Sequence, residues 1–394
     1  MSEDKKKWQM TIDFIMIIAK YFKSNNDFIN IMKVCKRYLE LVDMYKFNPI
    51  SDITLFNNIQ TQHFYKLTDT IWERQGLYQY IHWYSIEYKN KDVINNNKIY
   101  KNIYILTKDI INNNGCINIP EGIQQIKGDD YCDFSHKNIN NIKFSNNLKK
   151  IGKYAFSGSS ITSIIIPEGV TKLGNFCFSD CSQLTNIILP STLKEICKDA
   201  FSLSNIKTVI IPEGVTKIGD NCFHNCSCLT NISLPSSLKE IGNRVFLDTS
   251  IKNVTIPNNV IKFGHSCFMF CEQLTNINLN FRINCLPYGS FMLTGISNII
   301  IPEGITRIDD FCFERCRNLS KLELPHSLIE IGEFSFSETS LNNMTLFENV
   351  LIIEKGAFSK CKLLREVNIY SKRIRIHPDA FNLLGCAKSN KFMF

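Results

Sequence analysis

The sequence lacks the short motifs that mark most enzymes. It contains no glycine-rich phosphate-binding loop, no His-Glu-x-x-His pair and no nucleophile elbow. Its seven histidines are scattered, and its acidic residues recur at fixed spacings instead of converging on one segment. We therefore expect a protein that is not an enzyme and that needs no cofactor.

Charge of one sign does not accumulate anywhere in the chain. The formal net charge of +8 is divided evenly, because residues 1–110 hold 16 basic and 12 acidic residues and residues 111–394 hold 29 and 25. Without a basic tail or face, a nucleic-acid partner is not predicted.

Long apolar runs are also missing. The apolar segment 12–22 contains Asp13 and Lys20 and is too short to span a bilayer. The first residues have charge but no apolar core of the kind found in secretory signals. These features predict a cytoplasmic protein with no transmembrane segment, and display at the cell surface without a signal peptide is the alternative.

A repeat fills most of the chain. An aromatic residue recurs along the chain. After the first interval, the spacing alternates between a shorter and a longer value that differ by one residue. Two coils therefore form one super-repeat, and a fixed period in this range predicts a solenoid. The aromatic positions are Tyr131, Phe156, Phe178, Phe201, Phe223, Phe246, Phe268, Phe291, Phe313, Phe336, Phe358 and Phe381.

One coil shows why the repeats must stack. Leu184, Ile187 and Leu189 have the L-x-x-L-x-L spacing, and the alternation at its end predicts a short strand that stops at Pro190. We expect Leu193, Ile196 and Phe201 to turn inward on the return path. In sister coils a glycine such as Gly242 follows the inward isoleucine, and we expect a tight turn there. A single coil cannot bury these side chains, whereas stacked coils can.

The repeat resembles that of BspA-type leucine-rich repeat proteins. Leu229, Ile232, Leu234, Pro235, Leu238, Ile241, Gly242 and Phe246 match its pattern nearly intact, and the match extends over residues 117–381. The resemblance implies an α/β-type leucine-rich repeat solenoid with one short parallel strand per coil, in a surface or interaction protein. Departures occur where Asn280, Phe347 and Tyr370 replace the proline.

Most of the 16 cysteines follow the repeat. Cys181, Cys226, Cys271, Cys316 and Cys361 recur once per super-repeat, which places them two rungs and about 9–10 Å from one another, too far for disulfides. Serine or threonine takes the same position in the intervening coils, so we predict a small buried slot. A metal site at Cys222, His224, Cys226 and Cys228 is the alternative, but its spacing fits no usual zinc motif and no metal is predicted.

The N-terminal segment 1–50 has a helical pattern. Val34-Cys35-Lys36-Arg37-Tyr38-Leu39 is similar to the end of an F-box, although the usual leading Leu-Pro is missing. We expect either a helical cap on the solenoid or an F-box-like module, similar to the N-terminal region of BspA-type proteins from unicellular eukaryotes. The resemblance implies docking to a ubiquitin-ligase linker subunit through Ile17, Phe22, Phe28, Ile31, Val34 and Tyr38.

Aromatic residues are concentrated in residues 51–116. Tyr84, Ile86 and Tyr88 alternate with other residues, as do Tyr104 and Leu106, and both patterns predict strands. We interpret this region as a connecting or capping segment that covers the end of the solenoid. The predicted organisation is therefore a module at 1–50, this region at 51–116, twelve coils at 117–381 and a C-terminal cap or tail at 382–394.

The outward positions of the strands are mostly Thr, Asn or Ser. Isoleucine interrupts this pattern on three consecutive rungs, which predicts an apolar stripe and a partner-binding surface. The alternative is a tolerant surface that merely favours β-branched residues. The candidate binding residues are Ile165, Ile188, Ile210, Ile300, Lys207, Thr185 and Asn186.

The sequence thus predicts a non-catalytic scaffold that binds a protein along its sheet face. Two alternatives stay open, a substrate adaptor of a ubiquitin ligase and a cell-surface protein resembling an adhesin. The identity of the partner does not follow from the residues.

Overall fold

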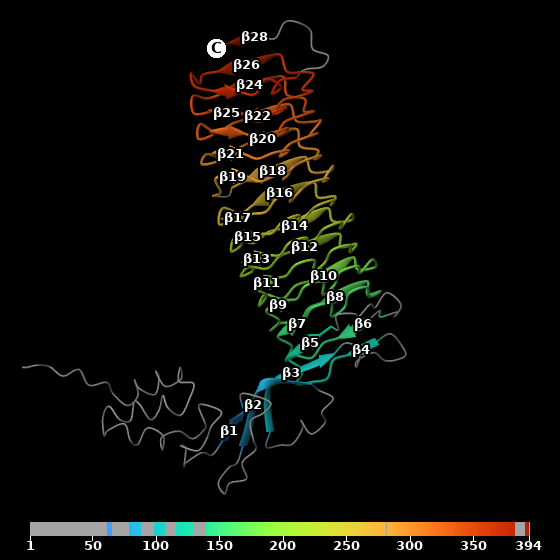
Figure 1. The fold of residues 1–394 in the computed structure, drawn as a ribbon. Coiled ribbons are helices and arrows are strands. Elements are labelled where there is room, and N and C mark those ends of the chain that lie inside the picture. Colours follow the sequence, from blue (N-terminus) through green and yellow to red (C-terminus); the bar gives the residue numbers. More distant parts are fainter. Residues whose placement is uncertain are drawn as a thin grey trace, which may run out of the picture. The chain divides into compact units, whose positions relative to one another are not determined.

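The computed structural model describes residues 61–64, 79–87, 98–106, 116–128, 139, 141–280, 282–382 and 391–393 (Figure 1). The chain divides into two units, Met1–Ile105 and Leu106–Phe394. In the first unit β1 (Thr61–Phe64), β2 (Gln79–Glu87) and β3 (Lys98–Leu106) pair in parallel in that order. Strands β2 and β3 agree with the predicted strands of the aromatic-rich region. The helical module predicted at 1–50 and its F-box-like residues lie outside the described residues.

The second unit is a parallel β-solenoid in which each coil contributes two strands. The first strand of each coil has three or four residues, and these strands form the long-strand side (Figure 1). They are β4 (Cys116–Asn118), β6 (Asn141–Lys143), β8 (Ser163–Ile165), β10 (Asn186–Ile188), β12 (Thr208–Ile210), β14 (Asn231–Ser233), β16 (Asn253–Ile256), β18 (Asn276–Leu279), β20 (Asn298–Ile300), β22 (Lys321–Glu323), β24 (Asn343–Leu346), β26 (Glu366–Ile369) and β28 (Lys391–Met393).

The second strand of each coil begins after the turn that follows the proline position and has two residues, except for β5, which has three. These strands form the short-strand side. They are β5 (Gln125–Lys127), β7 (Lys150–Ile151), β9 (Lys172–Leu173), β11 (Glu195–Ile196), β13 (Lys217–Ile218), β15 (Glu240–Ile241), β17 (Lys262–Phe263), β19 (Cys285–Leu286), β21 (Arg307–Ile308), β23 (Glu330–Ile331), β25 (Ile352–Ile353) and β27 (Arg375–Ile376).

The prediction of one strand per coil in an α/β-type repeat is therefore wrong for the described coils. Their return path contains a second strand and a series of turns, and no helix occurs within the described ranges. The reason is the length of the coil. Each coil is short and already contains two strands and their turns, so it has no room for a helix of the usual three turns.

The core is a column of stacked phenylalanine rings. The series has eleven phenylalanines, from Phe156 to Phe381. Rings of neighbouring coils lie against each other, with centroid separations of 5.1 to 5.9 Å. Leu184, Ile187 and Phe201 are buried as the repeat predicted. Offset stacking adds to the hydrophobic gain, so each coil depends on both of its neighbours for its largest contact.

The alternation between a shorter and a longer interval corresponds to two kinds of contact between coils. Long strands separated by the longer interval pair along their whole length, as β8 does with β10 and β16 with β18. Strands separated by the shorter interval share one pair, Asn186 with Thr208 or Asn231 with Asn253, and further along β18 and β20 belong to separate sheets. The super-repeat is therefore a pair of coils with a tight internal contact.

Turn residues lock the two coils of a pair together. Pro167 to Val170 form a turn in which Gly169 has φ of 97°, as the third residue of a type II turn requires. The Gly169 N–H donates to Thr192 Oγ1 of the next coil at 2.9 Å. In return, the Glu168 carboxylate accepts a bond from the Ser191 N–H at 3.0 Å. The same reciprocal lock joins Glu213 and Gly214 to the following coil.

Glycine after the inward isoleucine has a different role from the predicted tight turn. Gly219, Gly242 and Gly332 are not among the residues with positive φ. A Cβ atom on Gly242 would lie 2.6 Å from the backbone nitrogen of Asp220 in the preceding coil, and one on Gly219 would lie 2.5 Å from that of Lys198. The backbones of neighbouring coils approach each other closely at these glycines, whereas other coils have Cys197, Asp309 or Glu354 at the equivalent position.

One junction interrupts the array. On the short-strand side, hydrogen bonding is continuous from β5 to β17 and again from β19 to β27, but β17 and β19 belong to separate sheets. The coil at this junction has Asn280 in place of the proline and a half-buried Ile283 where sister coils bury Leu238 or Leu328. The Arg282 N–H donates to the Val260 carbonyl at 3.2 Å. In a sister coil the corresponding bond comes from Lys239, which occupies a later position within its coil.

Candidate functional site

The predicted isoleucine stripe is on the outer surface of the long-strand side. Strand alternation buries Ile164 and Ile187 and turns their neighbours outward. Ile165 is 66% exposed, Ile188 59% and Ile210 74%. Ile188 lies directly opposite Ile165 in the strand pairing, so the side chains occupy neighbouring rungs about 4.8 Å apart. The stripe consists of these three residues and ends at Ser233, which pairs with Ile210.

The other residues predicted for this surface have unequal positions. Asn186 and Lys207 are exposed beside the stripe. Thr185 is half-buried, and its hydroxyl donates to the Thr162 carbonyl at 3.1 Å, so its side chain serves the contact between coils. Ile300 is 66% exposed but lies four coils beyond Ile210, separated from it by Ser233, Thr255 and Asn278.

The cysteines occupy the buried slot that the repeat predicted. Cys226 Sγ donates to the Phe201 carbonyl at 3.1 Å and lies 3.4 Å from Ser204 Oγ. Burial raises the pKa of Cys226 to about 11, so the thiol is neutral and unreactive. The same contact joins Cys181 to Ser159, Cys271 to Thr249, Cys316 to Thr294 and Cys361 to Thr339.

The alternative metal site does not form. Cys222 and Cys226 are buried, whereas Cys228 is exposed, so the thiols do not face a common space. Within the described ranges, no group of three or more His, Cys, Asp or Glu side chains has a geometry that could hold a metal ion.

The recurring acidic residues are structural. The Glu168 and Glu213 carboxylates accept hydrogen bonds from backbone N–H groups of the next coil, and these bonds lower the pKa of both. On the short-strand side, Lys172 and Glu195 are 2.6 Å apart and Arg307 and Glu330 are 2.7 Å apart. Such partly exposed pairs contribute little to stability, and they face neighbouring coils instead of a shared cavity.

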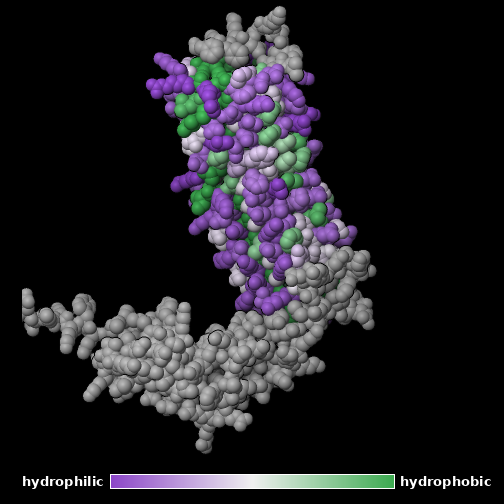
Figure 2. Space-filling model, in the orientation of Figure 1, coloured by the Kyte–Doolittle hydropathy of each residue, from purple (hydrophilic) through white to green (hydrophobic). Residues whose placement is uncertain are grey.

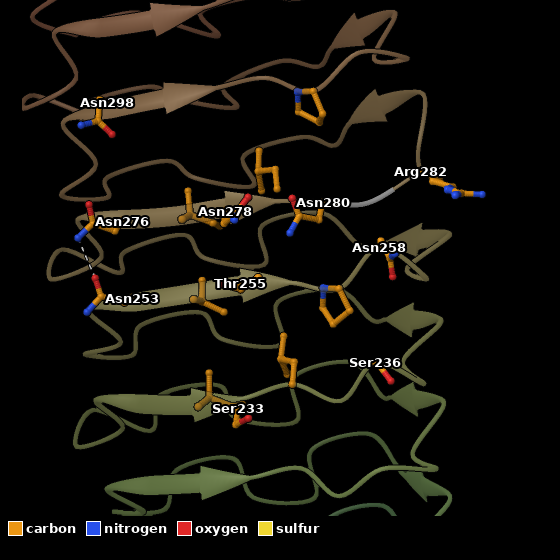
Figure 3. A pocket seen from close by; sticks show the side chains of 17 residues that line it. Ser233, Ser236, Asn253, Thr255, Asn258, Asn276, Asn278, Asn280, Arg282 and Asn298 are labelled. Atoms are coloured by element: carbon orange, nitrogen blue, oxygen red, sulfur yellow. Dashed lines mark hydrogen bonds between the residues drawn. The ribbon is translucent and has the colours of Figure 1, made fainter.

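Sequence reasoning did not identify a broad hollow on the described surface. It has a volume of about 1060 Å³ and lies across the long-strand side from β14 to β20 (Figure 3). Asn253, Asn276 and Asn298 form a column at the strand starts, and Asn280 lies at the opposite end of the hollow. The replacement of Pro by Asn280 was the sequence signal that could have found it.

A family model described as BspA type leucine-rich repeat region matches residues 97–229, 195–296 and 284–393. These matches together cover more than half of the chain. The chain belongs to the BspA-type leucine-rich repeat family. A BspA-type solenoid is a repeat scaffold typical of interaction or surface proteins and is generally not enzymatic. Within the described residues of this BspA-type chain, no helix has the length and apolar character that crossing a membrane requires.

Several solved structures are similar to this chain. A leucine-rich repeat protein from Bacteroides ovatus ATCC 8483 is 28% identical, with a TM-score of 0.50 over 66% of this chain and 82% of that one. A leucine rich cell surface protein from Faecalibacterium prausnitzii A2-165 is 20% identical, with a TM-score of 0.37 and coverage of 81% and 89%. The pneumococcal vaccine antigen PcpA is 16% identical, with a TM-score of 0.41 and coverage of 82% and 71%. No curated protein matches the chain.

Proposed function

We propose that this BspA-type chain is a non-catalytic scaffold that binds a protein partner through the isoleucine stripe. The supporting observation is the exposure of Ile165, Ile188 and Ile210 on three consecutive rungs, at 66%, 59% and 74%. On the face of the coils seen in Figure 2, hydrophilic residues predominate and hydrophobic ones form separate patches. An apolar patch in a polar field marks an interaction surface, because its burial in a complex removes apolar area from water.

The flanking residues favour a folded protein surface as the occupant of the stripe. Ser163, Asn186 and Thr208 start the same strands and are exposed on the same side as the isoleucines. An apolar centre with a polar border is the usual composition of a protein interface. Lys207 adds one positive charge at this border, where it would influence the rate of association more than the affinity.

The double variant Ile188→Asp, Ile210→Asp tests this site. Each carboxylate would be desolvated in the complex, so we expect affinity to fall at least about tenfold per substitution. Partners captured by the wild-type chain are identified by mass spectrometry, and their affinities are then measured with each purified variant. Thr345→Asp, at the same strand position on β24, is the matched control. Equal affinities for the double variant and this control would remove the stripe from the proposal.

Two finer functions rest on the sequence alone. Docking of residues 12–45 to a ubiquitin-ligase linker subunit is supported by the F-box-like Val34–Leu39 segment. We expect the full chain to capture such a subunit and the variant Val34→Asp, Tyr38→Asp to lose it. Failure of the wild-type chain, where a known F-box protein succeeds, would reject the adaptor function. Protease accessibility on intact cells distinguishes a cytoplasmic scaffold from a surface one.

A further inference from the structure

The hollow on the long-strand side lies where the lock between paired coils is missing. In three other pairs a glutamate, Glu168, Glu213 or Glu303, accepts a bond from the next coil, and the glycine after it donates to a Ser or Thr hydroxyl there. Here Asn258 and Asn259 replace the glutamate and glycine, and Asn280 replaces the next proline. This pair of coils therefore departs from the repeat at several positions, of which Asn258 and Asn280 border the hollow.

Ten of the 17 residues that line the hollow have polar side chains, and apolar residues such as Leu234 and Ile277 lie between them. Most of the polar side chains have no hydrogen-bond partner among the described residues. Asn276 Nδ2 donates to Asn253 Oδ1 at 2.8 Å, which leaves both amide hydrogens of Asn253 available. The side chains of Asn278, Asn280 and Asn298 have no hydrogen bond within the described part of the chain, and all three are exposed. In Figure 3 these amides line the hollow from one end to the other.

Three asparagines on the solenoid show how such a side chain can be used within the protein. Asn205, Asn259 and Asn349 each donate to a backbone carbonyl of the preceding coil, at 2.7, 2.7 and 2.8 Å. Those amides satisfy the polypeptide itself. Asn278, Asn280 and Asn298 form no such bond, so their hydrogen-bonding capacity is available to a ligand.

The charge of the hollow further restricts the ligand. Among the residues that line it, Arg282 is the one charged side chain, and no carboxylate is present. Arg282 is exposed, forms no ion pair with any described residue, and lies at the end opposite the Asn253 column (Figure 3). A cationic ligand has no counter-charge in the hollow, whereas a carboxylate can form a charge-assisted bond with the guanidinium.

Amides and hydroxyls both donate and accept, as sugar hydroxyls do. A ligand with many hydroxyl groups therefore matches Asn253, Thr255, Asn278 and Asn298 better than an apolar ligand does. Strands β16 and β18 pair along their whole length and therefore present these groups about 4.8 Å apart, which suits a ligand that is itself a repeat. A polypeptide would more commonly be recognised through an open strand edge or through apolar pockets, whereas the apolar residues of β16 are buried and those of β18 are buried or half-buried.

We propose that this hollow binds an acidic oligosaccharide, with the amide and hydroxyl side chains of β16, β18 and β20 bonding its hydroxyls and Arg282 bonding its carboxylate. The site is separate from the isoleucine stripe and does not depend on it.

Binding of defined glycans to the full chain tests the proposal. A panel of immobilised uronic-acid, sialic-acid and neutral oligosaccharides gives the initial ranking, and the acidic hit is then titrated calorimetrically beside its methyl ester, which keeps the skeleton and removes the charge. We expect the acidic form to bind at least about tenfold more tightly than the ester, because a charge-assisted bond is roughly twice as strong as a neutral one.

Three variants separate the contributions. Arg282→Ala should abolish the preference for the acidic form, and Asn278→Ala with Asn298→Ala should weaken both forms at least about tenfold. Asn343→Ala, at the strand start of β24 outside the hollow, should bind as the wild type does. Absence of binding to every acidic glycan of the panel, or binding unchanged in the Asn278→Ala, Asn298→Ala variant, would overturn the proposal. A peptide array whose binding depends on Asn278 would also overturn it, in favour of a polypeptide ligand.

Discussion

Single residues decide how the stacked coils satisfy their buried polar groups. Cys226 and Ser204 occupy the same slot in adjacent coils and contact each other at 3.4 Å. Threonine replaces the serine in the pairs with Cys271 and Cys316. A small side chain with one hydrogen to donate is sufficient in this slot, because the acceptor is the backbone carbonyl of the phenylalanine in the preceding coil. The buried cysteines of this slot are thus packing residues.

Alkaline pH should destabilise the protein through these thiols. Burial raises the pKa of Cys226 and of Cys271 to about 11, above the value of about 8.5 in an unfolded chain. A raised folded-state pKa means that this stabilisation is complete below about pH 8.5 and is lost as the pH rises toward 11. We expect the free energy of unfolding to fall over that range, by an amount on the order of 2 kcal/mol per thiol.

Chemical denaturation at a series of pH values measures this effect. The variant Cys226→Thr, Cys271→Thr uses the residue that the chain itself places in the slot, and its stability should decline less steeply above pH 8.5. Cys228→Ser, at an exposed position, should keep the wild-type slope. Identical slopes in all three proteins would show that the buried thiols do not cause the alkaline loss.

Turns are the elements that define the two-coil super-repeat. Hydrogen bonds in both directions join the Pro-Glu-Gly turn of one coil to the Pro-Ser-Ser turn of the next. Glu213 accepts from the Ser236 N–H at 3.0 Å and the Ser237 N–H at 3.3 Å, while Gly214 donates to Ser237 Oγ at 2.9 Å. A coil of one type therefore needs the other type as its following neighbour.

Removal of the glutamate should open this lock locally. In Glu213→Ala the amides of Ser236 and Ser237 lose their acceptor, so we expect them to exchange hydrogen at least about tenfold faster at neutral pH. Hydrogen exchange with mass spectrometry measures the change. Glu323→Ala, an exposed position on β22, should leave both amides at the wild-type rate, and the same result for Glu213→Ala would contradict the lock.

The same lock has a definite pH dependence. Its hydrogen bonds lower the pKa of Glu213, the bond from the Ser236 N–H most of all. The protection is therefore complete above the unfolded-chain value of about 4.3 and is lost as the pH falls through the lower folded-state value.

At the scale of the whole solenoid, the junction near Asn280 separates two blocks of coils. Short strands β5 to β17 share one sheet and β19 to β27 another. Contacts in a repeat array are limited to neighbouring coils, so a weak junction lowers the coupling between the coils on either side. The phenylalanine stack crosses the junction, with Phe268 and Phe291 5.9 Å apart.

Loss of one core ring should therefore act mainly within its own block. Phe336→Ala removes a buried side chain at a cost of about 3–5 kcal/mol, and we expect faster hydrogen exchange chiefly in residues 298–376. Phe201→Ala should have its effect chiefly in residues 141–263. Ile261→Ala, at a position 65% exposed, serves as the control with little effect. Equal acceleration on both sides of the junction would show that the solenoid unfolds as one unit.

Periodicity alone predicted the solenoid, the buried phenylalanine series, the cysteine slot and the outward isoleucines. These features follow from sequence because each depends on a spacing, and stacking of equivalent coils puts residues that are one interval apart in contact. The predicted module at 1–50 and the assignment of its docking residues stay predictions, since they lie outside the described residues.

The tertiary structure decided the contacts between coils. The second strand of each coil forms because a neighbour supplies its hydrogen-bonding partners, and Gly242 is required because the backbone of that neighbour is close. The amide hollow exists because several small departures from the repeat, Asn258 and Asn280 among them, meet on one surface. The sequence determined which side chains face inward in each coil, whereas stacking determined which outward side chains lie together, because that depends on the register between coils.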